Sequence, residues 1–124
     1  MKVLLSIKPE FAYKIFDGTK KYEFRRSIFK NSAIKKILVY ASSPVQKIIG
    51  EFEIDGILSA DPVALWSQTK DHSGISEKYF FEYFGGKACG YAIKIKKPVL
   101  YKIPKCIRRD FNLHPPQSFL YLTW

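Results

Sequence analysis

Short runs of β-forming residues, joined by very short connections, constrain the fold of this chain most strongly. Lys2–Ile7 and Ile34–Ala41 are apolar runs, and the long run Gln46–Leu58 follows the second after the turn Ser42–Pro44. So short a connection favours antiparallel neighbours, because parallel neighbours need a crossover of a dozen or more residues. Gly50 lies inside the long run, where we expect a bulge or a sharp bend.

Further β-type segments follow the same pattern. From Lys21 apolar and charged residues alternate, which is typical of a half-buried strand. Near the carboxyl end we expect two strands, Ala88–Ile95 and Val99–Ile103, separated by the sequence KKP, and a strand-like tail within Pro115–Trp124. The sequence therefore predicts five to six strands.

Helices interrupt these strands at places marked by capping residues. Pro9 opens a helix that Gly18 ends, and Asp61 followed by proline opens a second. Ser76 is the expected N-cap of a third helix within Ser73–Gly86, and a helical turn follows at Ile107–Phe111. We interpret the aromatic cluster of the third helix as core: Tyr79, Phe80, Phe81, Tyr83 and Phe84. The predicted fold class is α+β and mainly β, a bent barrel of five to six strands whose ends are covered by helices.

Composition narrows the functional classes. The chain has 124 residues, 47% of them hydrophobic and 16% aromatic, which predicts a single globular domain over residues 1–124. Lys and Arg total 21 against 11 Asp and Glu, a net charge of +10. A surface this basic attracts polyanions through a long-range, salt-sensitive field. Nucleic acid and an anionic membrane surface both satisfy that condition.

The cysteines and histidines indicate no metal site. Cys89, Cys106, His72 and His114 have none of the spacings of a ligand set, so we expect neither a metal nor another cofactor. Two isolated cysteines fit free thiols in a reducing compartment. The apolar run near the amino terminus is too short for a signal peptide, and no segment reaches transmembrane length. We therefore expect a cytoplasmic protein with no membrane partner.

The segment Gly18–Arg26, GTKKYEFRR, concentrates charge around two aromatic residues. Alternation points Tyr22 and Phe24 toward the core and leaves Lys21, Glu23 and Arg25 on the other face. We place Lys20 in the turn before the strand, where alternation does not apply. Such cations can hold phosphate oxygens, and a carboxylate among them can accept a hydrogen bond from a nucleobase. The alternative is a solvated strand face on which Glu23 pairs with its neighbours.

With these residues in place, the chain resembles the ASCH domain, a branch of the PUA-like superfamily of β-barrels. The family pattern Gly-x-Lys-x-x-Glu-x-Arg reads here as Gly18, Lys20, Glu23 and Arg25, within SIKPEFAYKIFDGTKKYEFRR. The closing PPQSFLYL is also similar to the tail of bacterial and archaeal members. The resemblance implies a PUA-like pseudo-barrel, a cleft between the first helix and the barrel, and a role in RNA binding.

Some small ASCH proteins are enzymes, namely amidohydrolases acting on N4-acylated cytidine and ribonucleases. In the amidohydrolases the residue three places after the motif lysine is a threonine proposed as nucleophile. This sequence has Glu23 there, and a carboxylate cannot replace that hydroxyl in the same mechanism. We therefore lean toward a protein that is not an enzyme. For a hydrolase, the candidate catalytic residues are Lys20, Glu23 and Glu51.

The candidate nucleic-acid-binding residues come from several parts of the chain. Lys8 precedes a helix amino terminus, which itself attracts anions, and Arg108 and Arg109 extend the basic surface toward the carboxyl end. The complete set is Lys8, Lys20, Lys21, Glu23, Arg25, Arg26, Ser42, Arg108, Arg109 and Gln117. Trp66 and Trp124 are candidates for stacking on bases, with core packing as the alternative.

Three functions remain open at this point. The leading prediction is an RNA-binding module that recognises RNA or a modified nucleotide in a basic cleft, in transcription or translation control. A small hydrolase and a protein-interaction domain are the alternatives. RNA is the expected partner, although the sequence does not distinguish it from DNA and leaves the oligomeric state open.

Overall fold

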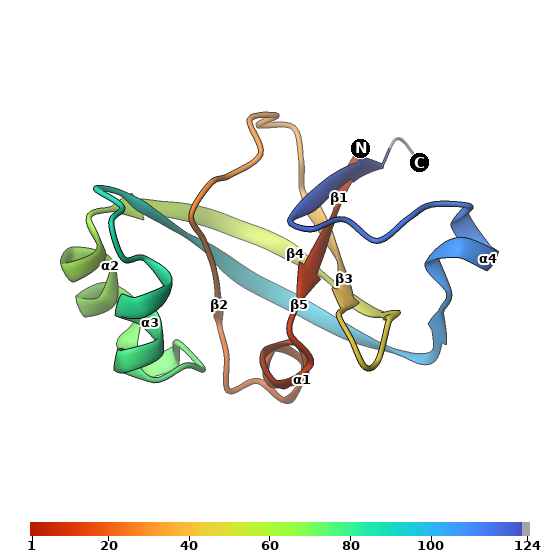
Figure 1. The fold of residues 1–124 in the computed structure, drawn as a ribbon, viewed down its shortest axis with the longest axis horizontal. Coiled ribbons are helices and arrows are strands. Elements are labelled where there is room, and N and C mark those ends of the chain that lie inside the picture. Colours follow the sequence, from red (N-terminus) through yellow and green to blue (C-terminus); the bar gives the residue numbers. More distant parts are fainter. Residues whose placement is uncertain (123–124) are drawn as a thin grey trace.

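The computed structural model describes residues 1–122, in which six strands form a single mixed sheet (Figure 1). The strands are β1 (Lys2–Ile7), β2 (Tyr22–Arg25), β3 (Lys36–Ala41), β4 (Lys47–Ala60), β5 (Gly90–Lys105) and β6 (Phe119–Leu122). The helices are α1 (Pro9–Asp17), α2 (Pro62–Thr69), α3 (Glu77–Tyr83) and α4 (Ile107–Phe111), with one 3₁₀ turn at Lys70–His72.

The order of the strands is β2–β5–β4–β3–β1–β6. All neighbours are antiparallel except β1 and β3, which are parallel and are connected through α1 and β2. The sheet curls into a half-barrel, and β2 and β6 form its two edges. The α+β prediction of a bent, barrel-like sheet is therefore confirmed, although backbone pairing among the described strands does not close the barrel.

One strand prediction is wrong. The two strands expected at Ala88–Ile95 and Val99–Ile103 are a single strand, β5, which pairs with β4 along most of its length. On its other edge β5 pairs with β2 only from Tyr91 to Lys94. The pairing of β5 with β4 shifts register between Glu51 and Glu53, opposite this point, and Lys97 has a φ of 51°. Pro98, which has no N–H to donate, therefore lies at a bulge, where a missing donor is tolerated. The KKP sequence therefore bends the strand instead of ending it.

The expected bulge at Gly50 is present. The pairing of β4 shifts register against β5 between Ile48 and Gly50. A Cβ atom on Gly50 would lie 2.4 Å from the carbonyl oxygen of Val99 and 2.5 Å from a ring carbon of Phe16. A glycine is needed here because the ring of Phe16 on α1 presses directly on the sheet.

The helix boundaries follow the expected capping residues. Gly18 ends α1 with a φ of 88°, in the left-handed region. The Asp61 carboxylate accepts a hydrogen bond from the backbone N–H of Ala64 at 3.0 Å, and the Ser76 hydroxyl accepts one from Tyr79 at 3.1 Å. These caps fix where α2 and α3 begin.

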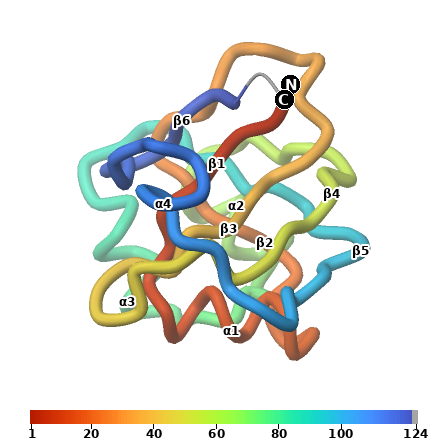
Figure 2. Tube along the Cα trace, turned by 90° about the vertical axis from the view of Figure 1, so that its right-hand side faces the viewer, coloured from red at the N-terminus to blue at the C-terminus, as the bar shows by residue number. Residues whose placement is uncertain are grey.

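Three hydrophobic clusters hold the helices to the sheet. Ala12 and Ile15 of α1 pack on β1, β3 and β4, and Ile107 of α4 packs in a separate cluster with other residues of β1 and β3. The third cluster joins α2 and α3 to β2 and β5 through Phe24, Phe80 and Phe84. Figure 1 shows α4 at one end of the molecule, α2 and α3 at the other, and α1 below the sheet between them. Figure 2, which faces the α4 end, shows α1 again at the bottom.

Candidate functional site

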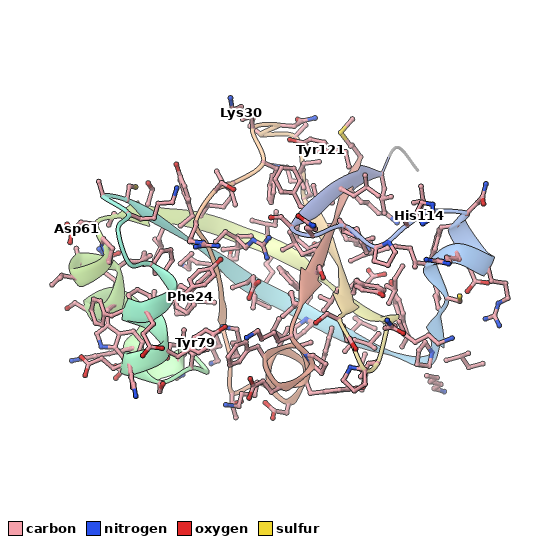
Figure 3. The ribbon with its side chains drawn as sticks, viewed as in Figure 1. Phe24, Lys30, Asp61, Tyr79, His114 and Tyr121 are labelled. Carbon is pink, nitrogen blue, oxygen red and sulfur yellow. The ribbon has the colours of Figure 1, made fainter. Side chains whose placement is uncertain are left out.

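A cavity of about 550 Å³ opens where the two edges of the sheet face each other. Its walls come from β1, β2, the start of α1, α3, and the segment before β6. Phe24 and Tyr79, both lining residues, lie near each other on the α3 side in Figure 3, whereas His114 lies toward α4. The cavity is lined by Ser6, Ile7, Lys8, Phe11, Lys20, Glu23, Phe24, Arg25, Arg26, Ser27, Ser42, Ile75, Tyr79, Tyr83, Gln117 and Ser118.

Three charged residues of the GTKKYEFRR segment form what we call the floor of this cavity. Lys20 is 2% exposed, Glu23 6% and Arg25 9%. Charged side chains are almost never buried to this degree unless they are paired. These three side chains therefore do not lie on a solvated strand face, which was the alternative for this segment.

Lys20 lies in the connection before β2 and is the most buried of the three. Its Nζ donates a hydrogen bond to the carbonyl oxygen of Ser73 at 2.9 Å. It also lies 4.7 Å from the centre of the Phe24 ring and 5.6 Å from that of Phe11. Burial lowers the pKa of Lys20 to about 8, although the nearby Glu23 carboxylate works in the opposite direction.

A glycine far along the chain makes room for this lysine. Gly74 has a φ of 70°, and a Cβ atom there would lie 2.5 Å from the Cβ of Lys20. The connection between α2 and α3 therefore packs against the lysine stem, while its Ser73 carbonyl accepts from the ammonium group.

Arg25 connects the two edges of the sheet. From β2, its Nη1 donates to Glu23 Oε2 at 3.4 Å and to the carbonyl oxygen of Ser6 on β1 at 3.5 Å. Its Nη2 donates to the hydroxyl of Ser118, just before β6. The Ser118 carbonyl in turn accepts from the backbone N–H of Ser6 at 3.1 Å. Among the described residues no backbone pairing joins β2 to β6, and the side chain of Arg25 connects these two edges instead.

Two tyrosines and two exposed cations form what we call the rim. The rings of Tyr79 and Tyr83, one turn apart on α3, are nearly parallel at 11° with centres 6.5 Å apart. The Nζ of Lys8 lies 5.3 Å from the Tyr79 ring centre, and the Arg26 guanidinium lies 5.2 Å from that of Tyr83. The rim therefore combines aromatic surface with positive charge.

The structure brings together most of the predicted binding residues. Those that line the cavity are Lys8, Lys20, Glu23, Arg25, Arg26, Ser42 and Gln117. Lys21 is exposed outside it, and its backbone bonds instead to His72 and Ile95. Arg108 and Arg109 lie on α4 and also do not line the cavity. Trp66 packs in the α2–α3 cluster, and Trp124 lies outside the described residues.

Glu51 does not join Lys20 and Glu23. It lies on β4, where its Oε2 is 2.7 Å from Lys36 Nζ and its Oε1 accepts from the Tyr101 hydroxyl at 2.7 Å. Burial works to raise the pKa of Glu51, but the hydrogen bonds from Lys36 and Tyr101 outweigh burial, so this pKa is lowered. Of the three residues considered for a hydrolase, Glu51 is therefore apart from Lys20 and Glu23, since it does not line the cavity and its carboxylate is paired with Lys36.

Several lining residues were not anticipated. Ser6 and Ser118 read as ordinary strand residues, although Ser6 lies two residues before Lys8 and Ser118 directly follows Gln117. Tyr79 and Tyr83 were assigned to the core with their neighbours, but only Phe80 and Phe84 of that cluster are buried. The signal was the spacing of four between the tyrosines, which places both on one side of the helix, next to the phenylalanine face.

The part of the chain that the structure describes, residues 1–122, contains no group of His, Cys, Asp or Glu that could hold a metal ion. Within the same range no helix has the length and apolar character needed to cross a membrane.

Comparison with known proteins places this geometry in a family. A ribonuclease containing an ASCH domain, from Zymomonas mobilis, is 32% identical over 126 aligned positions, which cover 99% of this chain and 83% of that protein. The crystal structure of ASCH from Zymomonas mobilis superposes with a TM-score of 0.90 at 30% identity, covering 98% of this chain and 87% of that one. The large ribosomal subunit protein uL22 of Ureaplasma parvum is 28% identical over 97% of this chain but only 39% of its own length. The model of the ASCH domain matches residues 5–99, and the chain therefore belongs to the ASCH domain family.

Proposed function

We propose that this protein binds single-stranded RNA, with one nucleotide in the cavity and the neighbouring phosphates at the basic rim. The observation that carries this proposal is the convergence of a buried Lys20–Glu23–Arg25 floor and an aromatic rim on one cavity. At about 550 Å³ the cavity falls in the size range of small-ligand sites, roughly 300–1,000 Å³. An unpaired nucleotide can enter such a site, whereas a base inside a duplex cannot.

The chemistry of the walls fits a nucleotide. Tyr79 and Tyr83 offer ring surface to a base, while Lys8 and Arg26 offer positive charge to phosphates. The net charge of +10 would strengthen binding along the rest of the strand. The Zymomonas mobilis relative, named as a ribonuclease, supports RNA as the polymer.

Fluorescence anisotropy with a labelled twelve-nucleotide RNA tests the proposal. We expect affinity to fall steeply as salt rises, with a slope of about −0.7 for each phosphate contacted. Arg26→Ala should weaken binding and reduce this slope, because Arg26 is exposed at the rim. Lys87→Ala, an equal loss of charge outside the cavity, should change affinity far less. Salt-independent binding, or equal effects of the two variants, would contradict the proposal. A DNA strand of the same sequence shows whether the protein prefers RNA to DNA.

A second candidate function, RNA cleavage, is favoured by the lowered pKa of Lys20, about 8, together with the ribonuclease relative. Neutral Lys20 would take the proton of a ribose 2′-hydroxyl while that oxygen forms a bond to the adjacent phosphorus. The bond from phosphorus to the 5′-oxygen would break, the leaving oxygen would take a proton from water, and Arg25 would stabilise the extra charge on the phosphate.

Cleavage of a labelled RNA, followed on a gel, tests this second function. We expect cleavage to require the 2′-hydroxyl, to accelerate between pH 7 and 8, and to disappear in Lys20→Ala. RNA that stays intact with the wild-type protein would leave binding as the function.

A further inference from the structure

The floor of the cavity keeps hydrogen-bonding capacity that the protein itself does not use. The Lys20 ammonium group has three N–H donors, and among residues 1–122 its hydrogen-bond acceptor is the Ser73 carbonyl. The rings of Phe11 and Phe24 cover part of the group without accepting a full hydrogen bond. Lys20 is almost completely shielded from bulk solvent but lines the cavity, so a ligand that enters the cavity can reach its remaining donors.

Glu23 also has capacity to spare, whereas Arg25 has less. The Glu23 carboxylate can accept about four hydrogen bonds, and in the described chain it accepts one, from Arg25 at 3.4 Å. Arg25 already donates to Ser6, Glu23 and Ser118, which ties it to both edges of the sheet. The groups that face a ligand are therefore a donor, Lys20, and a neighbouring acceptor, Glu23.

This pairing argues against a phosphate on the floor. A phosphodiester offers acceptors only, so it would satisfy Lys20 but place a second anion beside the buried Glu23 carboxylate. Lys8 and Arg26 are exposed cations at the rim, where solvent screens charge. Phosphates are better placed there, which leaves the floor for an uncharged polar group that both donates and accepts.

We propose that the floor binds a guanine base, with Glu23 accepting from its two adjacent N–H groups and Lys20 donating to the neighbouring carbonyl. Guanine presents N1–H and the N2 amino group side by side, next to O6. Adenine, cytosine and uracil each offer a carboxylate only one such donor position on that edge. A purine also covers more of the Tyr79 and Tyr83 rings than a pyrimidine does. This proposal rests on the RNA binding proposed above, and it is an alternative to the cleavage scheme, which would place a phosphate on the floor beside Arg25.

The test measures the affinity of uridine heptamers whose central nucleotide is guanosine, inosine, adenosine, cytidine or uridine. A 2′-fluoro group at the centre prevents attack by that hydroxyl. We expect central guanosine to bind about tenfold more tightly than adenosine, cytidine or uridine, as for one well-formed base contact. Inosine lacks the N2 amino group and should lie between guanosine and the others.

The variant Glu23→Gln distinguishes a ligand with its base on the floor from one with a phosphate on the floor. The two arrangements predict opposite changes in the affinity for the guanosine heptamer. With a base on the floor, the variant loses the preference for guanosine, so all heptamers bind within about twofold of one another. With a phosphate on the floor, the variant binds every heptamer more tightly, because the repulsion is gone. Glu53→Gln is the matched control, since Glu53 is only partly buried, pairs with Lys97 and does not line the cavity.

The outcomes also separate this inference from the function on which it rests. Equal affinity of the wild-type protein for all heptamers, or tighter binding by Glu23→Gln, would overturn guanine recognition and leave RNA binding intact. Absence of salt-dependent binding to any heptamer would overturn both. If circular dichroism shows that Glu23→Gln is unfolded, Lys20→Met provides the same test, because it removes the donor to O6 and should also abolish the guanosine preference.

Discussion

Two clusters in this molecule, each containing a lysine and a glutamate, differ in how their charges are satisfied. The Glu51 group, Lys36, Glu51 and Tyr101, satisfies its carboxylate on both oxygens at 2.7 Å. The floor group, Lys20, Glu23 and Arg25, is more deeply buried, yet its ion pair is longer, at 3.4 Å. Short, mutually satisfied contacts are typical of a group that stabilises the sheet. Buried charge with spare hydrogen-bonding capacity is typical of a binding site.

The largest expected difference between the two groups is in how stability depends on pH. The pKa of Lys20 falls from 10.5 to about 8 on folding, because burial disfavours its charge. Between these values the unfolded chain binds more protons than the folded one, so the free energy of unfolding rises with pH. From pH 7 to 10 the wild-type protein should gain roughly 2 kcal/mol relative to Lys20→Met. Urea unfolding at several pH values measures this gain.

Lys36→Met is the control for that experiment. The hydrogen bond from Lys36 to Glu51 raises the pKa of Lys36 in the folded protein, so folding does not remove its proton in this pH range. The difference in free energy of unfolding between Lys36→Met and the wild-type protein should therefore stay nearly constant from pH 7 to 10. If the Lys20→Met curve also runs parallel to the wild-type curve, Lys20 is not a destabilised cation and the contrast between the groups fails.

The variants Lys20→Met and Lys36→Met should also differ in their affinity for RNA. Lys20→Met removes a charged donor from the cavity and should weaken binding on the order of 30-fold, as expected for a charged hydrogen bond. Lys36→Met removes the same charge outside the cavity and should change the dissociation constant by about threefold or less. Anisotropy at a single salt concentration compares them, and similar losses for both would mean that only net charge matters.

The smallest expected effect belongs to the Glu51 group. Tyr101→Phe removes the hydroxyl that donates to Glu51 and should lower the free energy of unfolding by about 1 kcal/mol. RNA affinity should not change, because Tyr101 does not line the cavity. Urea unfolding and anisotropy on the same preparation check both statements, and a loss of affinity would show that the two groups are coupled.

Local sequence signals predicted the elements and the motif well. Gly18, Asp61 and Ser76 marked helix ends, and the alternation from Tyr22 identified β2. The break expected in β5 failed for a reason outside the local sequence. Whether Pro98 ends a strand depends on how the partner strand pairs around it, and β4 accommodates it with a register shift opposite Lys97, whose φ is 51°.

The site was predicted less completely, because its geometry depends on distant parts of the chain. Charge and alternation alone could not reveal that Lys20 is buried, since its acceptor Ser73 is 53 residues away. Nor could they distinguish Glu23 from Glu51, because both are strand glutamates with lysines nearby. Only the fold shows that Glu23 lines the cavity and that Glu51 is paired with Lys36 and Tyr101. The tyrosines of α3 became part of the site because β2 and α1 stand opposite them.

Gly74 has a consequence for how variation in this family is interpreted. It carries no functional group and does not line the cavity, yet any side chain there would collide with the stem of Lys20. A relative that keeps the motif lysine but has a larger residue at this position must hold the ammonium group elsewhere. Whether a relative shares the proposed binding chemistry is therefore judged from two positions, the motif lysine and the glycine that packs against it, and not from the motif alone.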